Sequence, residues 1–386
     1  MSTTPVPSQS LLPLVIQADH LPAYHAPYPS RHPITKQRIV PLHISFQDFQ
    51  NGLPPVGLIT KPVLKALEKE QALKFFSLAK EIKSCDIKKD GRRVECGACS
   101  ECLQKQKQDK SRAAYKLSVL CVFFAEEINE KGKEARTEAM ADILNRWKAE
   151  GRFPEATKLW MDELFPIYAY PQSRAFKATN STARQPFGNV AFEMERAGVP
   201  LFGCQAFGVH MTAYEGEGED MKIWIPRRSA DRHRSPLKYD SSVAGGLPAK
   251  HTPLEGLLKE CEEEAGWPEE LIRKYVKSAG MVSYYEIMED GAILPSTYTY
   301  DLPLPPRSSP TYIHPSPNDD EVDSFELLPV QQVILSLHKD KFKPSSAMVT
   351  IDFLVRHGFV TPDNETNYQE IVRRMHRRID VTGPGI

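Results

Sequence analysis

The chain has 386 residues, a formal net charge of −1 at pH 7 and seven cysteines. This length has room for two domains or one enlarged domain, and the balanced charge excludes any general attraction to nucleic-acid polymers or anionic membranes. No apolar run approaches the length of a membrane span, and the N-terminus lacks the basic start and apolar core of a signal peptide. Because an odd number of cysteines indicates free thiols in a reducing compartment, we expect a cytoplasmic protein.

The first half of the chain is predicted to be an α+β domain. Residues 1–10 are polar and contain proline, which predicts a disordered tail. Residues 11–190 mix short apolar runs with helical patterns near Pro62–Leu78 and between Arg136 and Tyr168. We therefore expect an N-terminal α+β domain over residues 11–190.

A cysteine-rich insertion interrupts this domain near residues 83–125. Its spacing is Cys-x10-Cys-x2-Cys-x2-Cys, and four thiolates at short range suit tetrahedral zinc. An iron–sulfur cluster lacks a matching full signature, and an insertion without metal is the third alternative. The candidate ligands of a structural zinc ion are Cys85, Cys96, Cys99 and Cys102.

The second half of the chain has a strand-like pattern that is interrupted by helices. The expected strands are Leu201–Tyr214, Met221–Pro226, Ala279–Tyr285 and Thr297–Leu304. A short helix falls between the second and the third of them. This order predicts a layered α/β sandwich with a mixed sheet over residues 191–345. Residues 346–386 are predicted to add a C-terminal helical extension.

The short helix has clear sequence signals at both ends. Thr252 is a predicted N-cap, Pro253 occupies the first helical position, and Glu255 stands where it can close a capping box. Gly266 followed by Pro268 is a stop signal. The helix should therefore run from Pro253 to Ala265.

Four glutamates are crowded into five positions of this helix. At about 100° per residue, Glu260, Glu263 and Glu264 share one face, whereas Glu262 points away. Like charges at this spacing repel each other, and the macrodipole disfavours anions near a helix C-terminus. Carboxylates in such an arrangement suit Mg²⁺ or Mn²⁺, which commonly hold substrate phosphates. We predict a metal site for a diphosphate here, with a charged surface face as the alternative.

The segment from Gly245 to Trp267 resembles a Nudix box. Lys259 to Trp267 match the second half of that motif with Lys in place of Arg, Gly245 falls on its glycine, and His251 stands where the family has a glutamate. The resemblance implies a Nudix α/β/α sandwich and a hydrolase of phosphorus anhydrides. It also implies that Glu260, Glu263 and Glu264 hold the metal, and that Glu263 or Glu264 accepts a proton. Since His251 cannot orient Lys259 as a glutamate would, we expect Glu255 to support Lys259 instead.

The flanking sequence resembles one Nudix subgroup, whose fungal members are known as thiamine pyrophosphokinase-related proteins. We expect no kinase activity, since no kinase domain follows the Nudix region. The resemblance implies that thiamine diphosphate, or its damaged oxo and oxy forms, is cleaved to the monophosphate. The alternatives are 8-oxo-guanosine diphosphate as substrate and, because of His251, a Nudix-fold module that binds ligand without catalysis. The matching segments are Phe207–His210, Ile223–Ser229, Val243–Gly246, Tyr298–Leu302, Asp352–Phe353 and Arg356–Gly358.

Further residues are candidates for substrate contacts. Gly245 and Gly246 would let the backbone approach phosphates. Arg227 and Arg228, at the end of a strand, could grip phosphate oxygens or be solvated. Trp224 and Tyr298 could stack on a ring, with core packing as the alternative for Trp224. Glu321 is a candidate metal ligand or base, with a solvated loop as the alternative. The sequence makes no prediction of the oligomeric state.

Overall fold

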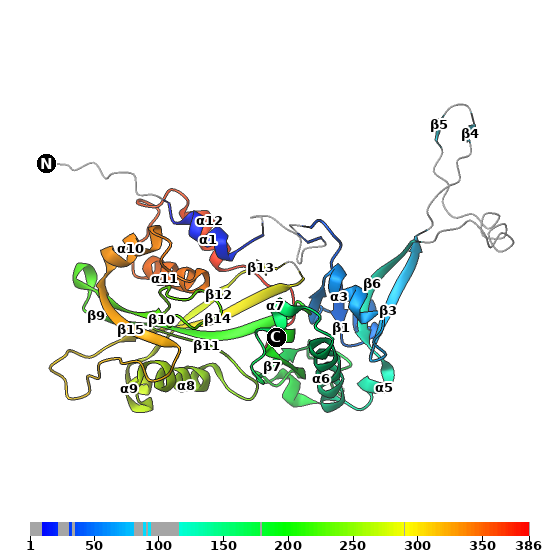
Figure 1. Cartoon of the computed structure of the whole chain (residues 1–386), viewed down its shortest axis with the longest axis horizontal. Helices are drawn as coiled ribbons and strands as arrows, with labels where there is room; N and C mark the ends of the chain where they lie inside the picture. Colours follow the sequence, from blue (N-terminus) through cyan, green and yellow to red (C-terminus); the bar gives the residue numbers. More distant parts are fainter. Residues whose placement is uncertain are drawn as a thin grey trace.

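The computed structural model describes residues 10–21, 31–32, 35–80, 88–89, 92–93, 116–177, 180–288 and 290–385. These residues form two α/β units that lie side by side, the first built on strands β1 to β8 and the second on strands β9 to β15 (Figure 1). The four candidate zinc ligands of the cysteine-rich insertion lie outside the described residues. No helix of the described part is long and apolar enough to cross a membrane.

The second unit is built on a seven-stranded mixed sheet with the order β12-β14-β9-β10-β15. The short strands β11 and β13 pair with β9 and β14 respectively. Strands β14 and β9 are parallel, whereas the other pairs are antiparallel. The predicted mixed sheet is therefore confirmed. Its strands are β9 (Gln205–Glu215), β10 (Lys222–Arg228), β11 (Val243–Gly246), β12 (Lys277–Ser283), β13 (Glu286–Ile287), β14 (Ala292–Pro303) and β15 (Val322–Pro329).

Helices cover both faces of this sheet. On one face, Leu257 and Cys261 of α8 pack with Val209 of β9, and α9 completes the layer. On the other face, Met348 and Phe353 of α11 belong to the same core cluster as β10 and α12. The predicted α/β/α sandwich is confirmed. The helices are α8 (Pro253–Ala265), α9 (Glu269–Tyr275), α10 (Val330–His338), α11 (Pro344–Arg356) and α12 (Tyr368–Met375).

The helix nearest the N-terminus packs on this second unit. Helix α1 (Leu12–Ala18) lies beside α12, at the opposite end of the sequence (Figure 1). Leu14, Val15 and Ala18 of α1 belong to the core cluster of α11. The charged Asp19 that follows is fully buried between Arg374 and Arg377. Residues 11–21 therefore belong structurally with the sandwich, although the sequence pattern groups them with the N-terminal domain.

The first unit contains a four-stranded sheet with the order β2-β1-β6-β3 and a separate two-stranded hairpin of β7 and β8. Strands β4 (Lys88–Lys89) and β5 (Arg92–Arg93) pair with each other. The remaining strands are β1 (Val40–His43), β2 (Gly57–Ile59), β3 (Leu73–Lys80), β6 (Lys116–Phe124), β7 (Leu164–Tyr168) and β8 (Val190–Glu195). The helices are α2 (Phe46–Gln50), α3 (Lys61–Leu67), α5 (Glu126–Asn129), α6 (Lys133–Ala149) and α7 (Pro154–Thr157).

Two predicted helical stretches of this unit are helical only in their first parts. The helix expected near Pro62–Leu78 ends at Leu67, because residues 73–80 pair with β6 over their whole length. The helices expected up to Tyr168 give way to β7, which pairs with β8. In both cases a partner distant in sequence decides the strand.

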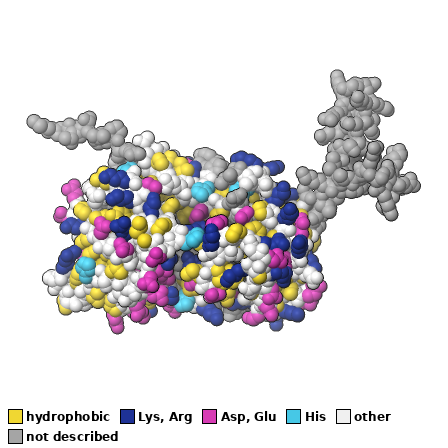
Figure 2. All heavy atoms as spheres, viewed as in Figure 1, with side chains coloured by type: hydrophobic (Ala, Val, Ile, Leu, Met, Phe, Trp, Pro, Cys, Tyr) yellow, Lys and Arg dark blue, Asp and Glu magenta, His cyan; other side chains and the backbone are white. Residues whose placement is uncertain are grey.

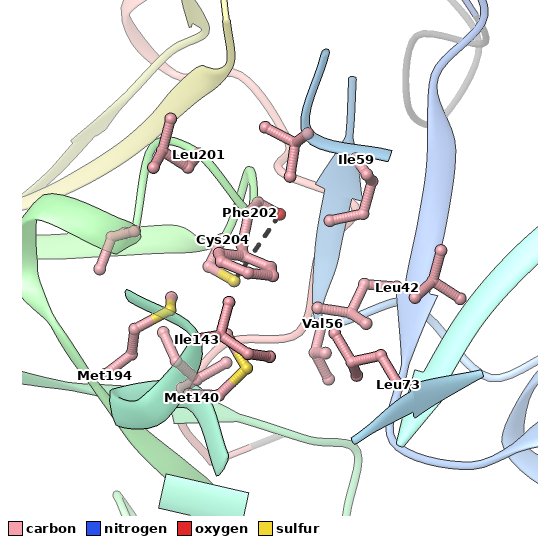
Figure 3. Close-up of a cluster of buried hydrophobic side chains, with 14 of the residues drawn as sticks. Leu42, Val56, Ile59, Leu73, Met140, Ile143, Met194, Leu201, Phe202 and Cys204 are labelled. Carbon is pink, nitrogen blue, oxygen red and sulfur yellow. Dashed lines mark hydrogen bonds between the residues drawn. The ribbon is translucent and has the colours of Figure 1, made fainter. Parts of the chain in front are cut away.

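The core of the first unit continues into the start of the sandwich (Figure 3). Leu201, Phe202 and Cys204, which directly precede β9, pack with Met140 and Ile143 of α6. The N–H of Leu58 on β2 donates to the carbonyl of Phe202 over 2.9 Å. The two units therefore share buried apolar surface and backbone hydrogen bonds.

Candidate active site

Helix α8 begins and ends where the sequence predicts. Thr252 Oγ1 accepts from the N–H of Glu255 (3.3 Å), and the Glu255 carboxylate accepts from the N–H of Thr252 (2.8 Å), so the capping box is closed. Gly266 ends the helix with a φ of 63° in the left-handed region. The helix spans Pro253–Ala265 as predicted.

Glu255 does not support Lys259, and that prediction is wrong. The Glu255 carboxylate is committed to the capping box, where hydrogen bonds from Thr252 lower its pKa. Lys259 Nζ instead lies 2.8 Å from Glu263 and 3.8 Å from Glu260. His251 is exposed, and its Nδ1 lies 3.3 Å from the carbonyl of Ala249.

The three glutamates of the predicted face occupy different environments. Glu264 is buried, and its Oε2 accepts from the N–H of Ala244 on β11 over 2.8 Å. Burial, followed by repulsion from Asp240, raises the pKa of Glu264 well above its ordinary value. Burial also raises the pKa of Glu260 to about 7, although Lys259 opposes the shift. Glu263 is exposed. Glu262 is also exposed, and its exposure is what the helical geometry predicts.

Gly245 makes room for Glu260. A Cβ atom on Gly245 would lie 2.1 Å from Glu260 Cδ, so any side chain at this position would displace the carboxylate. A Cβ atom on Gly246 would lie 2.7 Å from the ring of Phe165, which comes from β7 of the other unit. The glycine pair therefore allows a carboxylate and an aromatic ring to approach β11 directly.

A cavity of about 560 Å³ opens in front of these groups and is bordered by both units. Gly245, Gly246, Glu260 and Glu263 form one wall. This volume falls within the range of small-molecule sites. Acidic and basic side chains are interspersed over the face drawn in Figure 2, in keeping with a net charge of −1. The other charged residues and histidines of the lining are Lys158, Glu163, Arg196, His210, Arg228, Asp231, Arg232, His233, Arg234, Lys259, Asp319, Glu321 and Lys343.

Only some of the predicted substrate residues lie at this cavity. Arg228 lines it, but its guanidinium pairs with Asp240 at 2.7 Å and donates to two backbone carbonyls. Arg227 borders a different depression of the surface. Trp224 lies in the core beneath α8 and donates from Nε1 to Glu215 over 3.0 Å. Tyr298 stacks on Phe207, with ring centroids 6.2 Å apart, and does not line the cavity.

The segment after β10 brings further basic groups that the sequence analysis missed. The cavity is lined by Arg232, His233 and Arg234, and also by Lys343, the residue directly before α11. Arg232 holds Glu321 at 2.5 Å, so Glu321 is at the cavity as an ion-paired carboxylate. The concentration of basic residues between 227 and 234 was a signal for this wall. His210 also lines the cavity, and burial lowers its pKa to about 4, so its imidazole is neutral at pH 7.

The donor atoms at the cavity fit a hard divalent cation. Among the described residues, no three His, Cys, Asp or Glu side chains already surround a common point as metal ligands. Two of the acidic groups that border the cavity are paired with basic groups of the chain, Glu263 with Lys259 and Glu321 with Arg232. Burial and neighbouring carboxylates raise the pKa of both Glu260 and Glu264, which is the situation that a divalent cation relieves.

Comparison with known proteins agrees with this geometry. Residues 206–350 match the family model of the NUDIX domain. It is 38% identical to the uncharacterized protein YJR142W of Saccharomyces cerevisiae, over 48% of this chain and 57% of that protein. It is 35% identical to Nudix hydrolase 24, chloroplastic, of Arabidopsis thaliana, over 63% of this chain and 60% of that one. Nudix hydrolase 20, chloroplastic, of the same plant is also 35% identical, over 64% and 59%. The chain thus spans about six-tenths of the length of these relatives.

Proposed function

We propose that the protein is a metal-dependent hydrolase that cleaves the diphosphate of a small molecule. The observation that carries the proposal is the position of Glu260. Its carboxylate has a pKa of about 7, borders the cavity and packs against Gly245 of β11. Glu263 lines the same wall, and Glu264 lies behind it. The Nudix domain match over residues 206–350 supports the same class of reaction.

Each side chain has a role that follows from its position. Glu260 and Glu263 would hold Mg²⁺ or Mn²⁺, which supplies Lewis-acid chemistry at phosphorus when bound. Glu264, whose carboxylate is fixed by the N–H of Ala244, would accept the proton of the attacking water. Arg232 and Arg234, which line the cavity from the segment after β10, would hold phosphate oxygens. The water oxygen bonds to the terminal phosphorus as the bridging P–O bond breaks, which gives the monophosphate and inorganic phosphate.

We further propose that the substrate is thiamine diphosphate or one of its oxo or oxy analogues. The resemblance of the flanking motifs to the thiamine pyrophosphokinase-related subgroup supports this choice. A cavity of about 560 Å³ is large enough for a ring system with a diphosphate. The second candidate is 8-oxo-guanosine diphosphate, which has the same diphosphate on a different ring.

Release of inorganic phosphate tests the proposal. The wild-type protein should release phosphate from thiamine diphosphate, oxythiamine diphosphate or 8-oxo-guanosine diphosphate with Mg²⁺, and should release none with EDTA. Glu264→Gln should lower kcat by about 10²-fold or more, since it removes the proton acceptor. Glu262→Gln is the matched control, because Glu262 lies on the same helix but points to solvent.

Two results would contradict the enzyme proposal. If no diphosphate is hydrolysed with Mg²⁺ while thiamine diphosphate still binds, the chain is a ligand-binding module on a Nudix fold. If Glu264→Gln and Glu262→Gln lose activity equally, Glu264 has no special part in the chemistry.

A further inference from the structure

The end of the β7–β8 hairpin presents a paired acid and base to the cavity. Leu164 is registered with Glu195, and just beyond this pair the N–H of Arg196 donates to the carbonyl of Glu163 over 2.9 Å. The backbone thus holds Glu163 and Arg196 across from each other. Their side chains make one contact of 3.4 Å, and 28% and 41% of their respective side-chain surfaces stay exposed. Both residues line the cavity.

The hairpin end is tied to the glycine strand and to the loop that precedes α8. The N–H of Ala249 donates to the carbonyl of Leu164 over 2.9 Å. The Phe165 ring lies so close to Gly246 that a Cβ atom there would be 2.7 Å away. Glu163 also acts electrostatically on Lys259 and Glu260, raising the pKa of each. This wall therefore lies within reach of a molecule whose diphosphate sits at the α8 glutamates.

The chemistry of the wall suits a flat polar ring. The Glu163 carboxylate can only accept hydrogen bonds, and the Arg196 guanidinium can only donate them. Beside them lies the buried ring of Phe165, with the Arg196 guanidinium 5.7 Å from its centroid. An amino-substituted nitrogen heterocycle carries N–H donors and ring-nitrogen acceptors on one edge, which complements this pair.

We propose that Glu163 and Arg196, both from the first unit, recognise the ring of the substrate, an amino-substituted nitrogen heterocycle. Helix α8 binds the diphosphate, and the first unit recognises the ring to which the diphosphate is attached. The inference rests on the proposed function and adds to it the residues that determine specificity.

The test compares a substrate that has the ring with one that lacks it. For wild type, Glu163→Gln and Arg196→Met, kcat/KM is measured with thiamine diphosphate and with methyl diphosphate, both with Mg²⁺. The ratio of the two values should fall about tenfold in each variant, mainly through a higher KM for thiamine diphosphate. The ratio is the informative quantity, because an effect of Glu163 on Glu260 or Lys259 acts on both substrates and cancels.

Glu269→Gln is the matched control. It breaks a surface ion pair with Arg273 that lies outside the cavity, so its ratio should equal that of wild type. Thermal unfolding midpoints of all variants show whether the fold is intact. If the ratio stays within about twofold of wild type in both Glu163→Gln and Arg196→Met, with 8-oxo-guanosine diphosphate as well as with thiamine diphosphate, the inference is wrong.

The inference and the proposed function fail in different ways. If wild type hydrolyses none of the diphosphates, the proposed function is wrong, and equilibrium binding of thiamine diphosphate replaces the kinetic measurement. Binding about tenfold weaker in Glu163→Gln than in Glu269→Gln would still support recognition by the hairpin end. Equal binding by these two variants would overturn it.

Discussion

At the scale of single residues, Glu260 combines burial with a charge that its surroundings oppose. Its side chain is 16% exposed, and the neighbouring acids Glu263, Glu321 and Glu163 all disfavour ionisation. Lys259 compensates only in part, because its ammonium lies closer to Glu263. A site that keeps a carboxylate under these conditions is less stable when the carboxylate ionises without a cation.

This environment predicts a pH dependence for the metal-free protein. The pKa of Glu260 is about 7 in the folded chain, against an ordinary value of 4.5, so the folded state binds more protons between these pH values. The free energy of unfolding should therefore fall as pH rises from 5 to 8 in EDTA, by at most about 3 kcal/mol from this group. Urea unfolding at both pH values measures the change. Glu260→Gln should lessen the loss, and Glu264, whose pKa is also raised, accounts for a remainder. A variant with an undiminished loss would contradict the assignment.

At the scale of elements, the contact between β11 and α8 positions the site. The N–H of Ala244 holds Glu264, and the missing side chain of Gly245 admits Glu260. Since β11 pairs with β9 from Val243 to Gly246, the strand cannot shift to accommodate a larger residue. The glycine is thus required by packing, in addition to any approach of phosphate.

Gly245→Ala should consequently damage the site through Glu260. The added methyl group would displace the carboxylate, and we expect a loss of about 1–3 kcal/mol of stability and a weaker affinity for Mn²⁺. A double-mutant cycle with Glu260→Ala isolates the cause, because that substitution removes the three atoms nearest the methyl group. Urea unfolding should give a coupling of about 1 kcal/mol or more. Additive effects would show that Gly245 acts independently of Glu260.

At the scale of the whole molecule, the two ends of the described chain are joined by a buried ion cluster. Asp19 accepts hydrogen bonds from Arg374 (2.9 Å) and from Arg377 (2.7 and 2.5 Å). Both arginines also donate to the carbonyl of Leu21. Helix α1 is thereby fixed against α12, on the sheet face opposite α8 (Figure 1).

Asp19→Asn should therefore destabilise the fold strongly. It leaves two buried guanidinium groups without their shared carboxylate, which typically costs about 3–5 kcal/mol. Asp340→Asn, which breaks the exposed pair with Lys238, should cost less than about 1 kcal/mol. Chemical denaturation of both variants measures the difference, and equal losses would mean that the cluster contributes no more than a surface pair.

The sequence by itself determined those features that depend on near neighbours. The bounds of α8 follow from Thr252, Glu255 and Gly266, because capping and termination involve residues within one turn. The exposure of Glu262 follows from helical geometry alone. The order of strands and helices likewise predicted the mixed sheet.

Only the tertiary structure decided what surrounds the glutamates. Phe165 and Glu163 reach the site because β7 meets the loop before α8, which is some 85 residues away in the chain, and no local pattern encodes that contact. The same holds for Trp224. The alternating pattern around it predicts a strand, but that pattern does not show whether its side chain lies in the core or lines the cavity. Helix caps are set by hydrogen bonds within a few residues, whereas a cavity is set by which distant surfaces exclude water together.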